Sequence, residues 1–219
     1  MWCITRITAE YRRRMYRLLD LYEKPYDERY PVVCVDEKSK QLIRDLRGPI
    51  KKVPEGYQLH DYEYKRNGTR NIFVAVEPQG GFREVQVTKT RTKWDFAMFI
   101  KYLLDTVYPN ALKLKLVMDN LNTHFMKSFY ETFAKEEADA ILNRLEFYYT
   151  PKHGSWLNMA EIEINALERE CIGGRIGSVT ALKREVEACA NQRNIEGKTI
   201  NWSFTKRDAY RKLSKHFVA

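Results

Sequence analysis

The sequence predicts an α/β protein with a mixed five-stranded sheet that carries helices on both faces. Three observations lead to this prediction. Five short β-rich apolar runs occur along the chain, and amphipathic segments of helical period separate several of them. Two of the runs are joined by a short Pro/Gly turn, which is typical of an antiparallel pair. The later runs alternate with helical segments, as strand–helix–strand units do.

The N-terminal third is predicted to contain one helix, one strand and a long connection. Residues 5–23 form an amphipathic helix, because their apolar residues recur at helical spacing and Pro25 follows. Residues 31–39, PVVCVDEKS, form a β-rich run that ends in an acid. Residues 44–70 are rich in Gly, Pro and Asn-Gly, so we expect an irregular connection there.

The rest of the chain supplies the other strands and most of the helices. Residues 71–81 and 83–90 are predicted to pair as antiparallel strands, and 114–119 and 145–151 to form two further strands. A helix is expected at 92–108, with Thr92 as its N-cap. Further helices are expected at about 125–137, 156–171, 178–194 and 204–217.

Composition narrows the classes of protein to consider. The 219 residues contain 38 Lys and Arg against 29 Asp and Glu, a net charge of +9. A basic protein attracts polyanions, and nucleic acid is the usual one. At 44% hydrophobic residues the chain can bury a core, and no apolar run approaches the roughly 20 residues of a membrane span. The N-terminus also lacks the apolar core of a signal peptide.

The four cysteines are isolated in the sequence and share no CxxC spacing, and the four histidines form no HxxxH pair. We therefore expect neither a disulfide framework nor a zinc site. The interpretation that follows is a reduced, cytoplasmic protein.

Two acids, Asp36 and Asp119, each end an apolar β-run. If these two strands are parallel neighbours, both carboxylates emerge at the same edge of the sheet. Carboxylates held close together repel each other, and a divalent cation such as Mg²⁺ removes that cost. Two such ions stabilise both the attacking and the leaving oxygen of a phosphodiester displacement. The alternative is structural: each Asp is then part of a strand-end turn or caps a helix.

A third acid should come from a helix that passes over this edge, and Glu161 and Glu163 are the candidates. They are two residues apart, so on a helix they point about 200° apart and at most one reaches a metal. Leu157 and Ile164 flank Glu161 and favour a packed position for it. Helical spacing leaves the choice open, and both could be ordinary solvated residues.

Three blocks, VVCVDEKS, LVMDNLNTH and YTPKHGSWLNMAEIE, together closely resemble the DDE-type transposases of the mariner-like superfamily. The resemblance is greatest to the bacterial insertion-sequence six-thirty group and covers roughly residues 5–215. The second block resembles the family's Asp-Asn-x-x-x-His pattern, and the third its Ser-x-Leu-Asn-x-x-Glu helix start. Three blocks in the family's order are far more specific than any one of them.

The resemblance implies an RNase H-like fold with adjacent, parallel strands for Asp36 and Asp119. It assigns the third ligand to Glu161, and it implies two Mg²⁺ ions per site, with Mn²⁺ as a substitute. It also implies residues that support the ligands or position the substrate, for which core polar groups and caps are the structural alternative. These are Asn120, His124, His153, Ser155 and Asn158.

Basic residues are the candidates for contact with DNA phosphates, although a solvated surface explains any one segment equally simply. The candidates are Arg12, Arg13, Arg14, Lys65, Arg66, Lys89, Arg91, Lys93, Lys152, Arg207 and Arg211. The expected partners are the double-stranded DNA of transposon ends and targets, and a second copy of the chain on that DNA. No membrane partner is expected, and the expected location is the bacterial cytoplasm, near the nucleoid.

The sequence departs from the family in two respects. Family members carry an N-terminal helix-turn-helix region, so residues 1–28 are interpreted as the linker helix that follows it and 29–219 as the catalytic domain. The spacing from Asp119 to Glu161 is also longer than in many relatives, with the excess expected at 135–144. Two rival functions remain, another RNase H-like nuclease and a non-catalytic DNA-binding remnant, although the three intact acids argue against decay.

Overall fold

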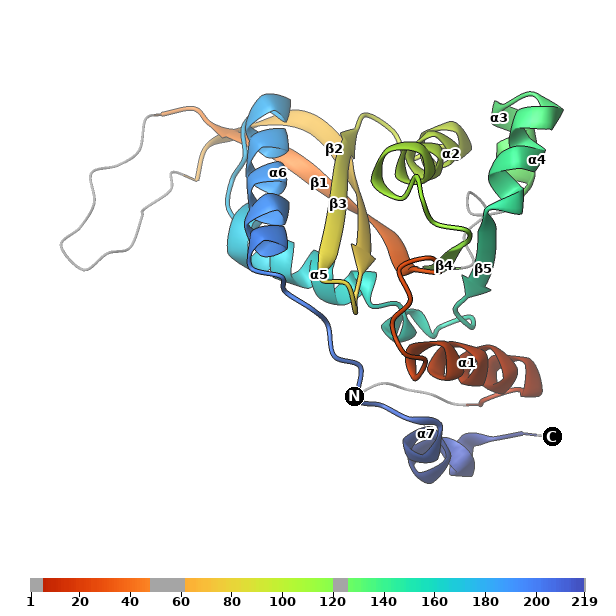
Figure 1. The fold of residues 1–219 in the computed structure, drawn as a ribbon. Coiled ribbons are helices and arrows are strands. Elements are labelled where there is room, and N and C mark those ends of the chain that lie inside the picture. Colours follow the sequence, from red (N-terminus) through yellow and green to blue (C-terminus); the bar gives the residue numbers. More distant parts are fainter. Residues whose placement is uncertain (1–5, 48–61, 120–125, 219) are drawn as a thin grey trace.

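Five strands form one mixed sheet in the computed structural model, which describes residues 6–47, 62–119 and 126–218. The strand order is β3-β2-β1-β4-β5 (Figure 1). β1 pairs antiparallel with β2, and β2 with β3, whereas β1–β4 and β4–β5 are parallel. The strands are β1 Val32–Asp45, β2 Tyr64–Glu77, β3 Phe82–Thr88, β4 Leu114–Met118 and β5 Leu145–Tyr149. The predicted mixed sheet is confirmed.

The first two strands are longer than the sequence predicted. β1 and β2 stay paired out to Asp45 and Tyr64, so the expectation of an irregular connection over 44–70 was wrong at both ends. Asn67 and Gly68, which resemble a turn in the sequence, lie inside β2, where the register shifts between Gln41 and Ile43. Gly68 has φ +87°, so a β-bulge with a residue in the left-handed region absorbs the Asn-Gly pair. Residues 48–61 lie outside the described part.

Helices cover both faces of the sheet (Figure 1). They are α1 Ala9–Tyr22, α2 Lys93–Tyr102, α3 Lys127–Thr132, α4 Lys135–Asn143, α5 Ala160–Leu167, α6 Val179–Ile195 and α7 Lys206–Leu213. π-helical turns extend α2 over Leu103–Val107 and α5 over Glu168–Ile172, and 3₁₀ turns occupy Ser155–Leu157 and Ser214–His216. Thr92 caps α2 in a reciprocal capping box with Asp95, as its position predicted.

One predicted helix is in fact two. The sequence indicated a helix at about 125–137 followed by a loop, but α3 and α4 are separate. The break occurs at Phe133, whose backbone is extended, and Phe133 packs against the core. Residues 135–144, where the extra length before Glu161 was expected, fall almost entirely in α4.

The alternation of side chains along the strands divides the core between the two faces. Val33, Val35 and Phe73 point to the face covered by α2, α3 and α4. Cys34 and Val74 point to the opposite face, where α1, α5 and α6 pack. Because the period is two, Asp36 shares the face of Cys34 and therefore points toward α5.

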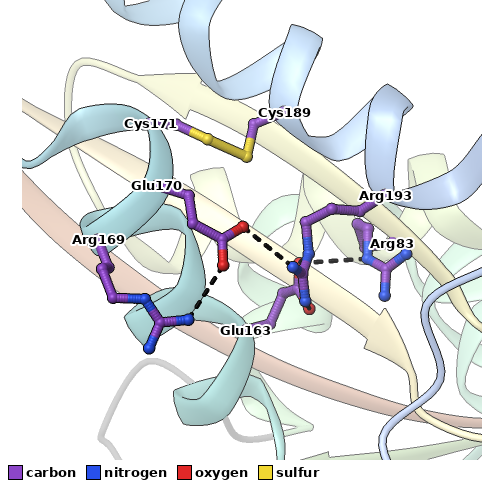
Figure 2. The surroundings of a disulfide bond; sticks show 7 residues. All are labelled: Arg83, Glu163, Arg169, Glu170, Cys171, Cys189 and Arg193. Atoms are coloured by element: carbon purple, nitrogen blue, oxygen red, sulfur yellow. Dashed lines mark hydrogen bonds and ion pairs between the residues drawn. A yellow bond between two sulfur atoms is a disulfide. The ribbon is translucent and has the colours of Figure 1, made fainter. Parts of the chain in front are cut away.

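A disulfide joins Cys171 at the end of the α5 extension to Cys189 in α6, with the Cα atoms 6.4 Å apart (Figure 2). The expectation that no cysteines would pair was wrong here, because residues 18 apart in sequence meet where the two helices pack. Cys34 is buried with a free thiol. No helix among the described residues is long and apolar enough to cross a membrane.

Candidate active site

Asp36 and Asp119 lie at the carboxyl end of the parallel pair β1–β4. The two strands pair from Val32↔Lys115 to Cys34↔Val117. Asp36 comes two residues after the last pair, and Asp119 directly follows β4. The prediction that their strands are adjacent and parallel is thus confirmed. Asp36 does not end its strand, however, because β1 continues beyond it paired with β2, where Asp36 lies opposite Val74.

The pKa of the Asp36 carboxyl is raised by burial and by neighbouring carboxylates. Burial raises the pKa of its carboxyl to about 7, a backbone N–H of Glu37 opposes the rise, and the carboxylates of Asp119, Glu37 and Glu161 add to it. The Glu37 N–H donates to Oδ1 at 2.8 Å. Asp36 therefore lies within electrostatic reach of both other acids that the resemblance selects.

Glu161 and Glu163, which helical spacing could not separate, occupy different environments on α5. Glu163 is fully buried and accepts two hydrogen bonds from Arg193, at 2.8 Å from Nε and 3.1 Å from Nη2 (Figure 2). Arg83 adds a second cation, with Nε 3.2 Å from Glu163 Oε1 in an ion pair that lacks hydrogen-bond geometry. Glu163 thus forms ion pairs with two arginines. Glu161 is only half-buried, and its negative charge helps to raise the pKa of Asp36.

The flanking residues had favoured the more packed position for Glu161, and this was wrong. Leu157 belongs to the 3₁₀ turn before α5, so it does not continue the helical surface of Glu161. Arg83 and Arg193, which bury Glu163, come from β3 and α6. Both are far away in sequence, so no local pattern marks them as partners.

Asn158 ties the start of α5 to the sheet beside Asp36. Its side chain is fully buried; Nδ2 donates to the carbonyl of Val35 at 2.9 Å, and Oδ1 accepts from the Ala160 N–H at 3.1 Å. Both ends of the amide are therefore used, one on the residue before Asp36 and one on the first turn of α5. This side chain fixes the helix that carries Glu161 against the strand that carries Asp36.

The other predicted supporting residues are less closely connected. Ser155 begins the 3₁₀ turn and is half-buried. His153 is exposed and has φ +62°, in a turn closed by the Gly154 N–H and the carbonyl of Pro151 at 2.8 Å. Asn120 and His124 lie outside the described residues.

The predicted DNA-binding residues do not form one surface. Lys65 and Arg66 lie on the outer half of β2, Lys89, Arg91 and Lys93 around the start of α2, and Arg207 and Arg211 on α7. Several have local partners: Lys93 pairs with Glu131 at 2.9 Å, and Arg211 with Asp208 at 2.7 Å. Arg12 stacks over the Phe217 ring. The structure does place Arg14 of α1 in one hollow with Lys152, which follows β5, and Arg13 in an adjoining hollow that also contains Arg14.

The donor set of Asp36, Asp119 and Glu161 has the chemistry that a hard divalent cation needs. Carboxylate oxygens are the ligands that Mg²⁺ prefers. The raised pKa of Asp36 shows that its ionisation is unfavourable here, and a bound cation would make it favourable. Within residues 6–47, 62–119 and 126–218, no three acidic, histidine or cysteine side chains converge closely enough to hold an ion as they stand. The three acids thus have the chemistry and the position at the sheet edge that a metal site needs, but they must lie closer together to bind an ion.

The fold and these acids define a class, an α/β domain with carboxylates at the carboxyl end of adjacent parallel strands. The family follows from the sequence: the model of the DDE superfamily endonucleases matches residues 31–183, and this chain belongs to that family. No curated protein matches the sequence.

Solved structures of the Mos1 mariner transposase are similar in fold. The paired-end complex with Mg has a TM-score of 0.56 at 15% identity, covering 88% of this chain and 56% of that one. The paired-end complex with Mn has 0.53 at 14%, covering 90% and 61%. The strand transfer complex has 0.52 at 14%, covering 83% and 52%. The fold is therefore the RNase H-like fold of that catalytic domain, and the chain spans little more than half the length of those proteins.

Proposed function

We propose that this chain is the catalytic domain of a DDE-type transposase of the mariner-like superfamily, in the insertion-sequence six-thirty group. It cleaves DNA strands and joins the ends to target DNA. The observation that carries the proposal is the position of Asp36 and Asp119 at the carboxyl end of the parallel β1–β4 pair, where the carboxylates of Asp119 and Glu161 both help to raise the pKa of Asp36. Membership of the DDE superfamily endonucleases supports it.

Asp36, Asp119 and Glu161 would together hold divalent cations, two Mg²⁺ ions or Mn²⁺ in their place. Bound there, such ions supply Lewis-acid stabilisation of the attacking and leaving oxygens of a phosphodiester. The three carboxylates must also come closer together than they lie now. Asn158 holds the start of α5, and with it Glu161, against the strand of Asp36.

The reaction proposed is hydrolysis of a phosphodiester at a transposon end, followed by attack of the freed 3′-hydroxyl on target DNA. Both steps are displacements at phosphorus, so one carboxylate site serves both and no covalent bond to the protein is needed. The Mos1 structures are a paired-end complex with Mn, a paired-end complex with Mg and a strand transfer complex. Those properties belong to Mos1, and here they support DNA and a divalent cation as partners.

Recognition of particular DNA ends and pairing of two copies on DNA are also part of the proposal. The chain covers 52–61% of the similar Mos1 chains, so functions that need the whole Mos1 length rest on that analogy. The proposed place of action is the bacterial cytoplasm, at chromosomal DNA.

The test is nicking of supercoiled plasmid in Mn²⁺, by the parent chain beside Asp119→Asn. We expect nicks from the parent and a loss of at least about 100-fold in Asp119→Asn, since a metal ligand is removed. Equal cleavage by the two proteins would place the site elsewhere. Faster cleavage of an RNA–DNA hybrid than of duplex DNA would support an RNase H-like nuclease of another kind, and DNA binding without cleavage would support a non-catalytic module.

A further inference from the structure

A basic groove lies between α1 and the segment at the end of β5; we call it the α1–β5 groove. It consists of two adjoining hollows of about 200 and 380 Å³ that share Arg14. Arg13 and Arg17 line the first hollow over Tyr148 and Tyr149. The second hollow runs on to the turn that follows β5. Its lining includes Arg6, Tyr11, Arg14, Pro151, Lys152 and His153.

The charge of the groove is strongly positive. Five Lys or Arg side chains line it against one acid, Glu10, which pairs with Arg14 at 2.7 Å. Arg17 lies 4.3 Å from the centre of the Tyr148 ring and 3.6 Å from Glu146. In the part of the chain that the structure describes, Arg13 and Lys152 are exposed and have no carboxylate partner. Uncompensated cations on both walls indicate an anionic ligand.

The groove adjoins the carboxylate site through two connections. The Thr150 N–H donates to the carbonyl of Met118 at 2.9 Å, so the end of β5 lies beside the residue before Asp119. The segment that forms one wall, 151–153, then leads through the 3₁₀ turn to Asn158 and Glu161. One wall of the groove and the helix of the third acid thus belong to one continuous segment.

We propose that the α1–β5 groove binds the backbone phosphates of a DNA strand that leads to the carboxylate site. The inference rests on the proposed function, because DNA is the substrate named there. Guanidinium groups bind phosphates through paired N–H donors, and a row of them along an open groove suits a chain of phosphates better than one small anion. The lining offers no base-selective pattern, so the expected contact is independent of sequence.

The test compares two double variants that each remove two exposed cations. Arg13→Gln/Lys152→Gln removes one from each wall of the groove. Lys183→Gln/Arg184→Gln is the control for the loss of two positive charges, because these residues are exposed on α6, on a different element from either wall, and Arg184 already pairs with Glu185. Gln keeps a long polar side chain, and none of the four residues belongs to the core, so both variants should unfold at the temperature of the parent.

Binding of a fluorescent DNA duplex is measured by anisotropy in EDTA, where the proposed cleavage does not occur, over a range of salt concentrations. For the groove variant we expect about 10-fold weaker binding near 0.1 M salt, and a slope of log K against log salt that is smaller by about 2. In the control variant, the loss of affinity and the change in salt slope should each be less than half of those in the groove variant.

A slope in the groove variant equal to that of the parent, or equal losses in groove and control variants, would overturn the proposal, as would absence of DNA binding by the parent. The plasmid assay in Mn²⁺ decides the proposed function separately. If the parent binds as expected but never nicks, the groove stands and the catalytic proposal fails. If the parent nicks and the groove variant binds like the parent, the reverse holds.

Discussion

Arg83 and Glu163 form an ion pair in which both side chains are completely withdrawn from solvent, with Nε 3.2 Å from Oε1 (Figure 2). The pair joins β3 to α5, and Arg193 from α6 completes it from the other side. Glu170 then pairs with Arg193 at 3.1 Å and with Arg169 at 3.0 Å, so the ion pairs continue from the buried Glu163 to the surface. The arrangement fixes the rotation of α5 and leaves Glu161, two residues earlier, on another side of the helix.

Substitution of Glu163 and of Glu161 should therefore separate stability from activity. Glu163→Gln leaves the fully buried Arg83 without its anion and takes from Arg193 one of its two carboxylate partners. We expect it to lower the free energy of unfolding by about 3–5 kcal/mol. Glu161→Gln should change it by less than about 1 kcal/mol and abolish nicking. Urea unfolding and the plasmid assay on both variants measure this. Loss of nicking with full stability in Glu163→Gln, and not in Glu161→Gln, would reverse the two roles.

The raised pKa of Asp36 predicts a pH dependence of stability for the metal-free chain. Its folded pKa of about 7 lies above the ordinary 3.8, so the folded state binds the proton more tightly. The free energy of unfolding should fall as the pH rises between about 4 and 7, and the whole penalty should be present above pH 7.

Asp36→Asn removes this penalty because it cannot ionise. In EDTA at pH 8 we expect the variant to be more stable than the parent by on the order of 1–3 kcal/mol, while at pH 4 the two should agree closely. Thermal unfolding at both pH values measures the difference. A variant less stable than the parent at pH 8 would show that Asp36 is favourably paired rather than crowded by Asp119 and Glu161.

Loss of the Asn158 amide should weaken both the fold and the reaction. Asn158→Ala leaves the Val35 carbonyl and the Ala160 N–H without their buried partner. We expect a cost of about 2–4 kcal/mol, and a fall in nicking that persists at temperatures where the variant is fully folded. Asn165→Ala is the control, since Asn165 is an exposed amide side chain on the same helix. Full activity of folded Asn158→Ala would show that the amide does not position α5 for the reaction.

The disulfide between Cys171 and Cys189 predicts a redox-dependent stability. It closes a loop of 18 residues between the α5 extension and α6. By reducing the conformational entropy of the unfolded chain, it should raise the free energy of unfolding by about 3 kcal/mol. Dithiothreitol should lower the free energy of unfolding of the parent by about that amount. It should have no effect on Cys171→Ser/Cys189→Ser. Alkylation of the unfolded, unreduced chain followed by peptide mapping should find Cys171 and Cys189 protected; alkylation of both would refute the bridge.

Much of this arrangement was predictable because it depends on local pattern. Alternating and helical periodicities located the five strands and most helices, and acids placed after apolar runs located Asp36 and Asp119. Thr92 was recognisable as a cap because its partner, Asp95, is three residues away. The family resemblance added the choice of Glu161, which spacing alone left open.

Features that depend on distant contacts were not predictable. The Asn67-Gly68 pair has the composition of a turn, and only pairing with β1 turns it into a bulge. Glu163 is buried because Arg83 and Arg193 reach it from other elements, and Cys171 meets Cys189 through helix packing. Arg17 lies one helical turn after Arg13, so the sequence could have placed it on the same face of α1. Its contact with the Tyr148 ring was not predictable, since that requires α1 to pack against β5.

Metal binding by the three acids is tested most directly by an anomalous difference map from crystals of the chain soaked in Mn²⁺. We expect a peak within about 2.5 Å of carboxylate oxygens of Asp36, Asp119 and Glu161, and its loss in crystals of Asp119→Asn. A peak held by other side chains, or no peak at Mn²⁺ concentrations where the protein cuts DNA, would contradict the claim that these three acids form the catalytic centre.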